Sequence, residues 1–197
     1  LTYTKTNRVE GDQTTHGPLP NGISTPAIFP VYNNDGTYNQ LGPYSNAVSI
    51  ANEAINENFS LRTLGNIYGE YQIIPGLIAN TKWGVDFYNL REHAYESTKT
   101  VQGAKFNGLG FETYTNVSNF VSNNTLRYQK TWDRHNMELM GGYSFEKRQT
   151  RTSFIRGQDF ADPSLQYHNS ASTIVSASSS GLDEGIRSFF GRLNYNF

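Results

Sequence analysis

The chain has 197 residues, of which 36% are hydrophobic and 17% charged, and it contains 13 Tyr, 12 Phe and no Cys. The absence of cysteine excludes a disulfide scaffold and a cysteine-ligated metal. Its 16 basic and 17 acidic residues leave a net charge of -1 with no block of like charges, so nucleic acid is not an expected partner. No apolar run approaches the roughly 20 residues of a membrane-spanning helix. Many aromatic residues and few Ala and Leu favour β structure.

The first stretch, residues 1–9, is weakly patterned and is predicted as a strand. It opens within an alternating polar segment, without an initiator methionine or the apolar run of a signal peptide, so we expect a fragment of a longer protein. The following stretch, residues 10–58, is long, polar and rich in Gly, Asn, Ser, Thr and Pro. It is predicted as a loop.

Residues 59–88 alternate with a period of two and predict an antiparallel hairpin around Pro75 and Gly76. Odd positions are mainly apolar and even positions mainly polar. We expect Ile73 to lie opposite Leu77, because this three-residue loop brings the two apolar faces together. On the polar side, the same register places Arg62 near Asp86 and Glu70 near Lys82, diagonally across the two strands.

A loop is predicted over residues 91–115, and a second hairpin follows it with strands at 116–132 and 137–147. Trp132 is expected opposite Met137, across a four-residue turn over residues 133–136, because this pairing again aligns the apolar faces. Residues 149–185 are predicted as a third long loop. The last strand, residues 187–197, brings the total to about six.

Short turns and long loops alternate along the chain, so an up-and-down meander puts all short turns at one end and all long loops at the other. This is the layout of outer-membrane barrels, with short periplasmic turns and long extracellular loops. The segment Leu77 to Phe87 has 11 residues, about the length with which a tilted strand crosses the hydrocarbon layer. The predicted fold class is an all-β, antiparallel transmembrane β-barrel fragment over residues 1–197. Six strands do not close a barrel, so we expect other sequence to complete the wall.

Several segments resemble a known family. The run 64–71 (LGNIYGEY), followed by 74–77 (IPGL) and 83–86 (WGVD), is similar to the barrel region of SusC/RagA-type TonB-dependent transporters of Bacteroidetes. Three further segments resemble the same family: residues 30–38 (PVYNNDGTY), 139–143 (LMGGY) and 189–197 (FFGRLNYNF). Their order and spacing together carry the resemblance.

The resemblance implies a large plugged barrel in the bacterial outer membrane that imports oligosaccharides or peptides. It also implies three partners: membrane lipid, a SusD-like surface lipoprotein, and TonB, which would act through a plug region. The chain itself shows no TonB box and no plug domain, so energy coupling follows from the resemblance alone.

Two alternatives remain open at this point. Phe197, preceded by Tyr195, Leu193 and other apolar residues at alternate positions, also resembles the C-terminal signal of bacterial outer-membrane proteins, which would make the chain the end of another such protein. In the SusC-like pattern the strand continues, and we favour that interpretation. The other alternative is a soluble all-β carbohydrate-binding module, in which the apolar faces form a core.

No enzymatic activity and no cofactor are predicted. The four His residues are far apart and lack the spacing of a zinc site, and no nucleophile motif or phosphate-binding loop occurs. Asp183 with Glu184, and Glu53 with Glu57, are expected to be loop charges. A turn is the expected structure of residues 33–36 (NNDG), since they lack the later Glu of a calcium loop.

The face pattern and the resemblance give three sets of candidate residues. Those expected to line the lumen are Arg62, Glu70, Lys82, Asp86 and Arg127. Loop aromatics expected to contact substrate or a surface partner are Tyr32, Tyr38, Tyr44 and Tyr167. Those expected to face lipid are Ile67, Trp83, Val85, Phe87, Leu139, Tyr143, Phe189 and Leu193.

Overall fold

The computed structural model describes residues 1–7, 17–41 and 44–197. It contains one antiparallel sheet of six strands in the order of the chain, β1-β2-β3-β4-β5-β6. The strands are β1 (Thr2–Asn7), β2 (Ala54–Ile74), β3 (Leu77–Glu96), β4 (Leu109–Trp132), β5 (His135–Phe160) and β6 (Ala171–Asn196). The predicted meander is therefore confirmed. In the first strand, Arg8 and Val9 lie outside the described residues.

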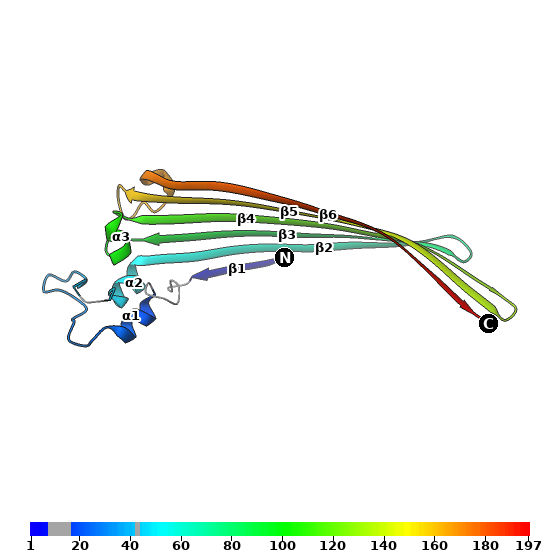
Figure 1. Cartoon of the computed structure of the whole chain (residues 1–197), viewed down its shortest axis with the longest axis horizontal. Coiled ribbons are helices and arrows are strands. Elements are labelled where there is room, and N and C mark those ends of the chain that lie inside the picture. Colours follow the sequence, from blue (N-terminus) through cyan, green and yellow to red (C-terminus); the bar gives the residue numbers. More distant parts are fainter. Residues whose placement is uncertain (8–16, 42–43) are drawn as a thin grey trace.

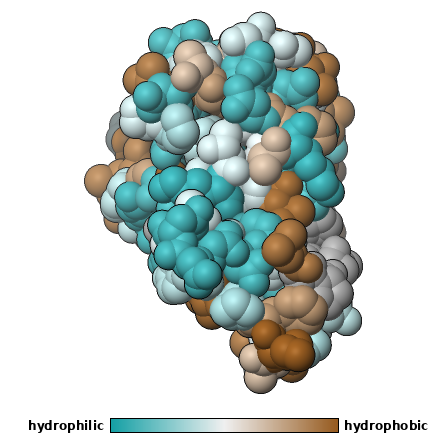
Figure 2. Space-filling view, turned by 90° about the vertical axis from the view of Figure 1, so that its left-hand side faces the viewer, coloured by the Kyte–Doolittle hydropathy of each residue, from teal (hydrophilic) through white to brown (hydrophobic). Residues whose placement is uncertain are grey.

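The long strands run side by side as a curved ribbon, with tight turns at one end and the longer connections at the other (Figure 1). We call these the turn end and the loop end. Short helices occur at the loop end: α1 (Pro18–Ser24), α2 (Ala47–Glu53), α3 (Val101–Lys105) and a single 3-10 turn, η1 (His168–Ser170). Seen from this end, the surface is mainly hydrophilic, with apolar residues gathered towards its margins (Figure 2).

The first hairpin has the predicted register along its length but not at its turn. Tyr71 pairs with Ala79, so the apolar faces of β2 and β3 coincide as expected. At the turn, however, Ile74 and not Ile73 lies opposite Leu77, and a bulge between Gln72 and Ile74 restores the predicted register. Gly76 has φ +85°, and a Cβ there would lie 2.3 Å from the carbonyl oxygen of Gln129. A two-residue turn with glycine at its second position therefore fits this site, and the bulge absorbs the extra residue.

The register predicted for the second hairpin is wrong by two residues. Trp132 pairs with His135, not Met137, across a two-residue turn formed by Asp133 and Arg134. Asp133 adopts φ +50°, a left-handed conformation that Asp tolerates better than most residues. The His135 ring also stacks on Trp132, with centroids 5.6 Å apart. A shift of two residues leaves every side chain on its predicted face.

The strands extend far into two of the predicted loops. Within 91–115 the connection is residues 97–108, and within 149–185 it is residues 161–170. Within 10–58, helices α1 and α2 and the first residues of β2 are ordered elements, while residues 10–16 and 42–43 lie outside the described part. The loop boundaries were therefore wrong, because the polar and Ser-rich segments continue to pair as strands beyond the apolar region.

A second layer does not cover the long sheet in the described part of the chain. The most deeply buried large side chains, Tyr95, Phe160, Leu109 and Ile50, gather near the loop end, whereas Ile67 is 75% and Phe189 is 81% exposed. A soluble sandwich would enclose such residues in a core. The structure therefore contradicts the soluble-module alternative and leaves an apolar face that needs a non-aqueous neighbour.

Candidate functional site

The polar face of the sheet carries side-chain hydrogen bonds that cross the strands. Arg62 donates from Nε and Nη2 to the two carboxylate oxygens of Asp86, at 2.9 and 2.6 Å. The Tyr68 hydroxyl lies 2.7 Å from a carboxylate oxygen of Glu70 and 2.7 Å from the amide oxygen of Asn80. Such a surface suits water, a polar solute or a polar protein segment, and does not suit hydrocarbon.

The same face continues across the later strands through Glu138 of β5. Its carboxylate accepts hydrogen bonds from Gln129 of β4 at 2.6 Å and from Arg192 and Asn194 of β6. One carboxylate thus joins three neighbouring strands. The sequence pattern does not single out Glu138, because a lone charge at an alternating position gives no sign of its partners.

All five residues predicted to line a lumen lie on this polar face by strand register. The contact between Arg62 and Asp86 is confirmed. Glu70 and Lys82 are diagonal neighbours, since Glu70 pairs with Asn80, but the carboxylate of Glu70 bonds to Tyr68. The structure therefore brings the set together on one face, and its role in a lumen stays a prediction.

The eight residues predicted to face lipid all lie on the opposite face, which we call the apolar face. Ile67 pairs with Trp83 between β2 and β3, and Leu139 pairs with Leu193 between β5 and β6. The rings of Tyr143 and Phe189 lie 5.1 Å apart, centroid to centroid. Phe120 of β4 joins the two groups across the sheet, since its ring centroid lies 5.5 Å from that of Trp83 and 6.3 Å from that of Phe145.

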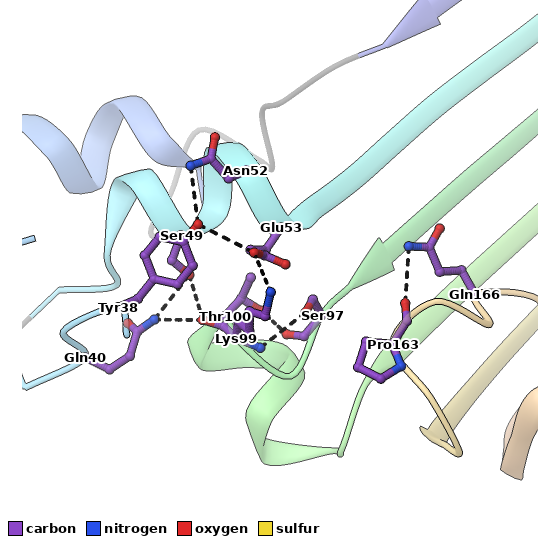
Figure 3. A network of polar contacts seen from close by, with 10 residues as sticks. All are labelled: Tyr38, Gln40, Ser49, Asn52, Glu53, Ser97, Lys99, Thr100, Pro163 and Gln166. Atoms are coloured by element: carbon purple, nitrogen blue, oxygen red, sulfur yellow. Dashed lines mark hydrogen bonds and ion pairs between the residues drawn. The ribbon is translucent and has the colours of Figure 1, made fainter. Parts of the chain in front are cut away.

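At the loop end, the connection between β1 and β2 packs against the connection between β3 and β4 (Figure 3). The carbonyl oxygen of Lys99 accepts hydrogen bonds from the Ser49 hydroxyl at 2.8 Å and from the Gln40 amide at 3.0 Å. The Lys99 ammonium lies 3.0 Å from a carboxylate oxygen of Glu53. The hydrogen bond to Glu53 and its negative charge raise the pKa of Lys99. Lys99 therefore holds the two connections together.

A cavity of about 480 Å³ lies beside this contact, lined by Tyr32, Tyr38, Glu53 and Lys99 among others. The rings of Tyr32 and Tyr38 are 5.5 Å apart, and these residues form a bridge that closes a small turn over residues 33–37. The Tyr38 hydroxyl accepts a hydrogen bond from Asn52 at 3.3 Å and lies 3.5 Å from Glu53. The cavity thus combines aromatic faces with both a cation and a carboxylate, which suits a polar organic molecule.

A second polar cluster lies on the same side of the sheet as the apolar face, but closer to the loop end. Arg91 contacts Glu112 at 2.6 Å, and the Tyr114 hydroxyl donates to the same oxygen of Glu112 at 2.8 Å. His168, from the connection between β5 and β6, lies 3.5 Å from the other oxygen. Glu112 is only 8% exposed. A buried ionic cluster of this kind does not fit a hydrocarbon surface, so the apolar face ends before this point on β3 and β4.

The structure separates the four predicted loop tyrosines. Tyr32 and Tyr38 share one cavity, and Tyr44 lines a different one beside α1 and α2. Tyr167 packs on the second polar cluster, where the Arg91 guanidinium lies 5.9 Å from its ring centroid. This cluster was not predicted. The signal that could have revealed it is that Arg91 and His93 continue the odd-numbered positions of β3, which are mainly apolar closer to the turn end.

Within the described residues, no group of His, Asp or Glu side chains is arranged to hold a metal ion. In the same part of the chain, no helix has both the length and the apolar character needed to span a bilayer. His16 lies outside the described residues.

Comparison with known proteins places these features in context, although no family model matches the chain. TonB-dependent receptor P3 of Formosa agariphila is 33% identical over 172 residues, which is 85% of this chain. TonB-dependent receptor P26 of the same organism is 29% identical over 193 residues, 90% of the chain. The chain is similar to TonB-dependent receptors. It spans 17% and 19% of the length of these two relatives.

Solved structures agree with this similarity to TonB-dependent receptors at the level of fold. The RagAB peptide importer in its closed-closed state has a TM-score of 0.76 at 17% identity, covering 99% of this chain and 23% of that one. The open-open state gives a TM-score of 0.73 with the same coverage. The chain therefore has the fold of a six-stranded segment from the barrel of such a transporter, which confirms the predicted fold class and resemblance.

Proposed function

We propose that this chain forms part of the barrel wall of a TonB-dependent nutrient importer of the SusC/RagA type, which spans the bacterial outer membrane many times and takes up oligosaccharides or peptides. The observation that carries the proposal is the division of a single-layered sheet into an exposed apolar face and a hydrogen-bonded polar face. A barrel wall between lipid and a hydrated lumen requires both. Similarity to two TonB-dependent receptors supports the same function.

In this proposal the polar face lines the lumen and holds the plug, with Arg62, Asp86 and Glu138 as its main polar groups. The loop end is extracellular, meets a SusD-like surface lipoprotein, and receives the solute. TonB acts through the plug, outside this chain. The protein moves its solute by gated passage and performs no covalent chemistry, in keeping with relatives named as receptors and transporters.

Deletion of the gene is expected to abolish growth of the source bacterium on the oligosaccharide or peptide that the importer carries, because that solute would lose its passage across the outer membrane. Growth on the corresponding monosaccharide or amino acids provides the control. The measurement is growth on a panel of such solutes for the wild type, the deletion strain and a strain lacking TonB. Unchanged growth on every solute, or recovery of the protein in the soluble fraction, would contradict the proposal.

The cavity beside Tyr32 and Tyr38 is proposed as a contact for the incoming solute, since exposed aromatic rings stack on sugar rings or peptide side chains. Replacing Tyr32 with Ala is expected to raise the solute concentration for half-maximal uptake about two- to tenfold, the effect of one aromatic contact. Tyr32 is suitable because its side chain lies outside the network around Lys99. Tyr44→Ala, in a different cavity, is the control, and an equal effect of both variants would argue against this contact.

A further inference from the structure

Charged residues on the apolar face have a regular distribution. Along β2 from Phe59 to Ile73 and along β3 from Leu77 to Asn89, this face contains no Asp, Glu, Lys or Arg. The same holds for β5 from His135 to Phe145 and for β6 from Phe189 to Phe197. On β4, Lys130 next to the turn is the one charged residue that this face carries between Tyr114 and Trp132. An uncharged band therefore crosses the sheet.

Basic residues mark the border of this band towards the loop end on four strands. Lys5 of β1 lies over the ring of Phe59 at 4.9 Å, and Arg91 of β3 lies over Tyr114 at 5.6 Å. Arg187 of β6 lies over Phe145 at 5.7 Å. Lys147 of β5 is the next residue on this face after Phe145. Three of these cations thus stand directly across from an aromatic residue and the fourth follows one along its strand, at the level where hydrocarbon would give way to headgroups.

Two of these cations differ from the others in their partners. Lys5 is paired with Glu57 at 3.1 Å, and Arg91 is paired with Glu112. Lys147 and Arg187 have no carboxylate within ion-pair distance in the described part of the chain. The neighbouring carboxylate on this face, Asp183, is paired with Arg151 and accepts a hydrogen bond from Gln149. Both cations are exposed, and the charge of Lys147 acts on Asp183 without forming an ion pair with it.

The register places Lys147 and Arg187 as diagonal neighbours. Arg187 pairs with Phe145, and Lys147 lies between Gly185 of β6 and Phe120 of β4, so neither strand partner of Lys147 is charged. Diagonal neighbours in a sheet lie about 7–8 Å apart, which two long side chains span easily when both reach one anion. Like charges at this distance repel, and a shared phosphate removes that repulsion because its oxygens accept hydrogen bonds from both.

Towards the turn end, the face below these cations has the shape and polarity for a lipid chain. Phe145, the Tyr143–Phe189 ring pair and the Leu139–Leu193 pair follow one another on β5 and β6. Between the two pairs, Gly141 faces Gly191, and a Cβ at Gly141 would meet nothing within 4 Å. An open hollow of about 550 Å³ continues from Gly141 across Leu126, Ala79 and Gly69. The distance from Phe145 to Gly141 is about 13 Å along the strand, within reach of one acyl chain.

We propose that Lys147 and Arg187 bind the phosphate headgroup of an anionic membrane lipid, whose acyl chain lies on the Tyr143, Phe189 and Gly141 surface. This inference rests on the proposed function in one respect, namely that the apolar face meets lipid. It adds a defined lipid site on β5 and β6, at the headgroup border on the loop side of the band.

The test uses the full-length protein that contains this chain, reconstituted in phosphatidylcholine vesicles with increasing fractions of phosphatidylglycerol. Native mass spectrometry after detergent extraction measures retained phosphatidylglycerol. Substituting both Lys147→Gln and Arg187→Gln is expected to weaken phosphatidylglycerol retention about 30-fold, the combined effect of two basic residues near an anionic surface. Lys82→Gln, which removes a basic residue from the polar face, is expected to leave retention unchanged.

Two measurements on the wild type make the test independent of the variants. Raising NaCl from 0.1 to 1 M should reduce phosphatidylglycerol retention, since salt screens the cations. Inorganic phosphate alone, at the same concentration as the lipid, should not displace it, because it lacks the acyl chain. Retention that is insensitive to salt, or equal in the double variant and the wild type, would overturn the lipid site. If the wild type does not insert into vesicles at all, both the lipid site and the proposed function are contradicted.

Discussion

Replacing Ile67 with Arg is expected to destabilise the full-length protein in phospholipid vesicles by about 2–4 kcal/mol, the cost of an arginine near the bilayer midplane on the lipid face of a barrel. Ile67 lies on the apolar face of β2, opposite Trp83, and it is 75% exposed. It stands about halfway along the uncharged run from Phe59 to Ile73. If this face contacted water, such a substitution at an exposed position would cost little.

The neighbouring residue provides a matched control. Asn66 lies one position earlier on the same strand, and its side chain points to the polar face, opposite Gly84. Asn66→Arg adds the same side chain at nearly the same depth but towards the lumen, so its effect should stay within about 0.5 kcal/mol. The measurement is denaturant-induced unfolding of the vesicle-inserted protein. Equal costs for the two variants would contradict the division into a lipid face and a lumen face, and a greater cost for Asn66→Arg would show that the faces are assigned the wrong way round.

The arrangement of strands and faces could be predicted from sequence because it depends on local alternation. In β2 and β3, every residue is assigned to a face once the odd-numbered positions are assigned to the apolar one. The pairing of Tyr71 with Ala79 therefore followed from the apolar pattern. The turn between Trp132 and His135 was harder to predict. Registers that differ by two residues place the same side chains on the same faces, so the apolar pattern alone does not distinguish them.

The ends of the strands were mispredicted for a physical reason. Beyond the uncharged band the alternation of apolar and polar residues is lost, as in the Ser-rich segment of β6 that pairs with Thr152 and Ser153. Such a sequence has weak strand propensity and resembles a loop. In the structure, this segment is extended because it forms hydrogen bonds with β5. Its partner residues on β5 are distant in sequence, so the segment alone does not reveal them.

The contacts of the loop end could not be predicted either. Gln40 and Ser49 bind the carbonyl oxygen of Lys99, 59 and 50 residues away. Glu53 was expected to be a loop charge, and its partner is that same lysine. Since each of these residues is an ordinary loop residue by itself, only the tertiary fold shows that they form one network.

Phe160→Ala is expected to destabilise the loop end by about 3–5 kcal/mol, the usual cost of removing a buried phenylalanine ring. Phe160 is 3% exposed, and its ring meets Tyr95 edge to face with centroids 5.1 Å apart. A Cβ added at Gly110 would lie 2.8 Å from the ring, so the backbone of β4 approaches it too closely for any side chain. The backbone amide of Phe160 also donates to the carbonyl of Asn107 at 2.9 Å. Phe160 therefore fixes the connection between β3 and β4 to the end of β5.

The loss should be local, because few buried side chains connect this region to the rest of the sheet, whose strands are held by their own hydrogen bonds. We expect faster amide hydrogen exchange and faster tryptic cleavage at Lys99 and Lys105 in the membrane-inserted protein, with the barrel still folded. Leu165→Ala is the control, since Leu165 lies in the adjacent connection but is 51% exposed. If Phe160→Ala and Leu165→Ala gave the same exchange over residues 97–108, the Phe160 ring would not be what holds this connection in place.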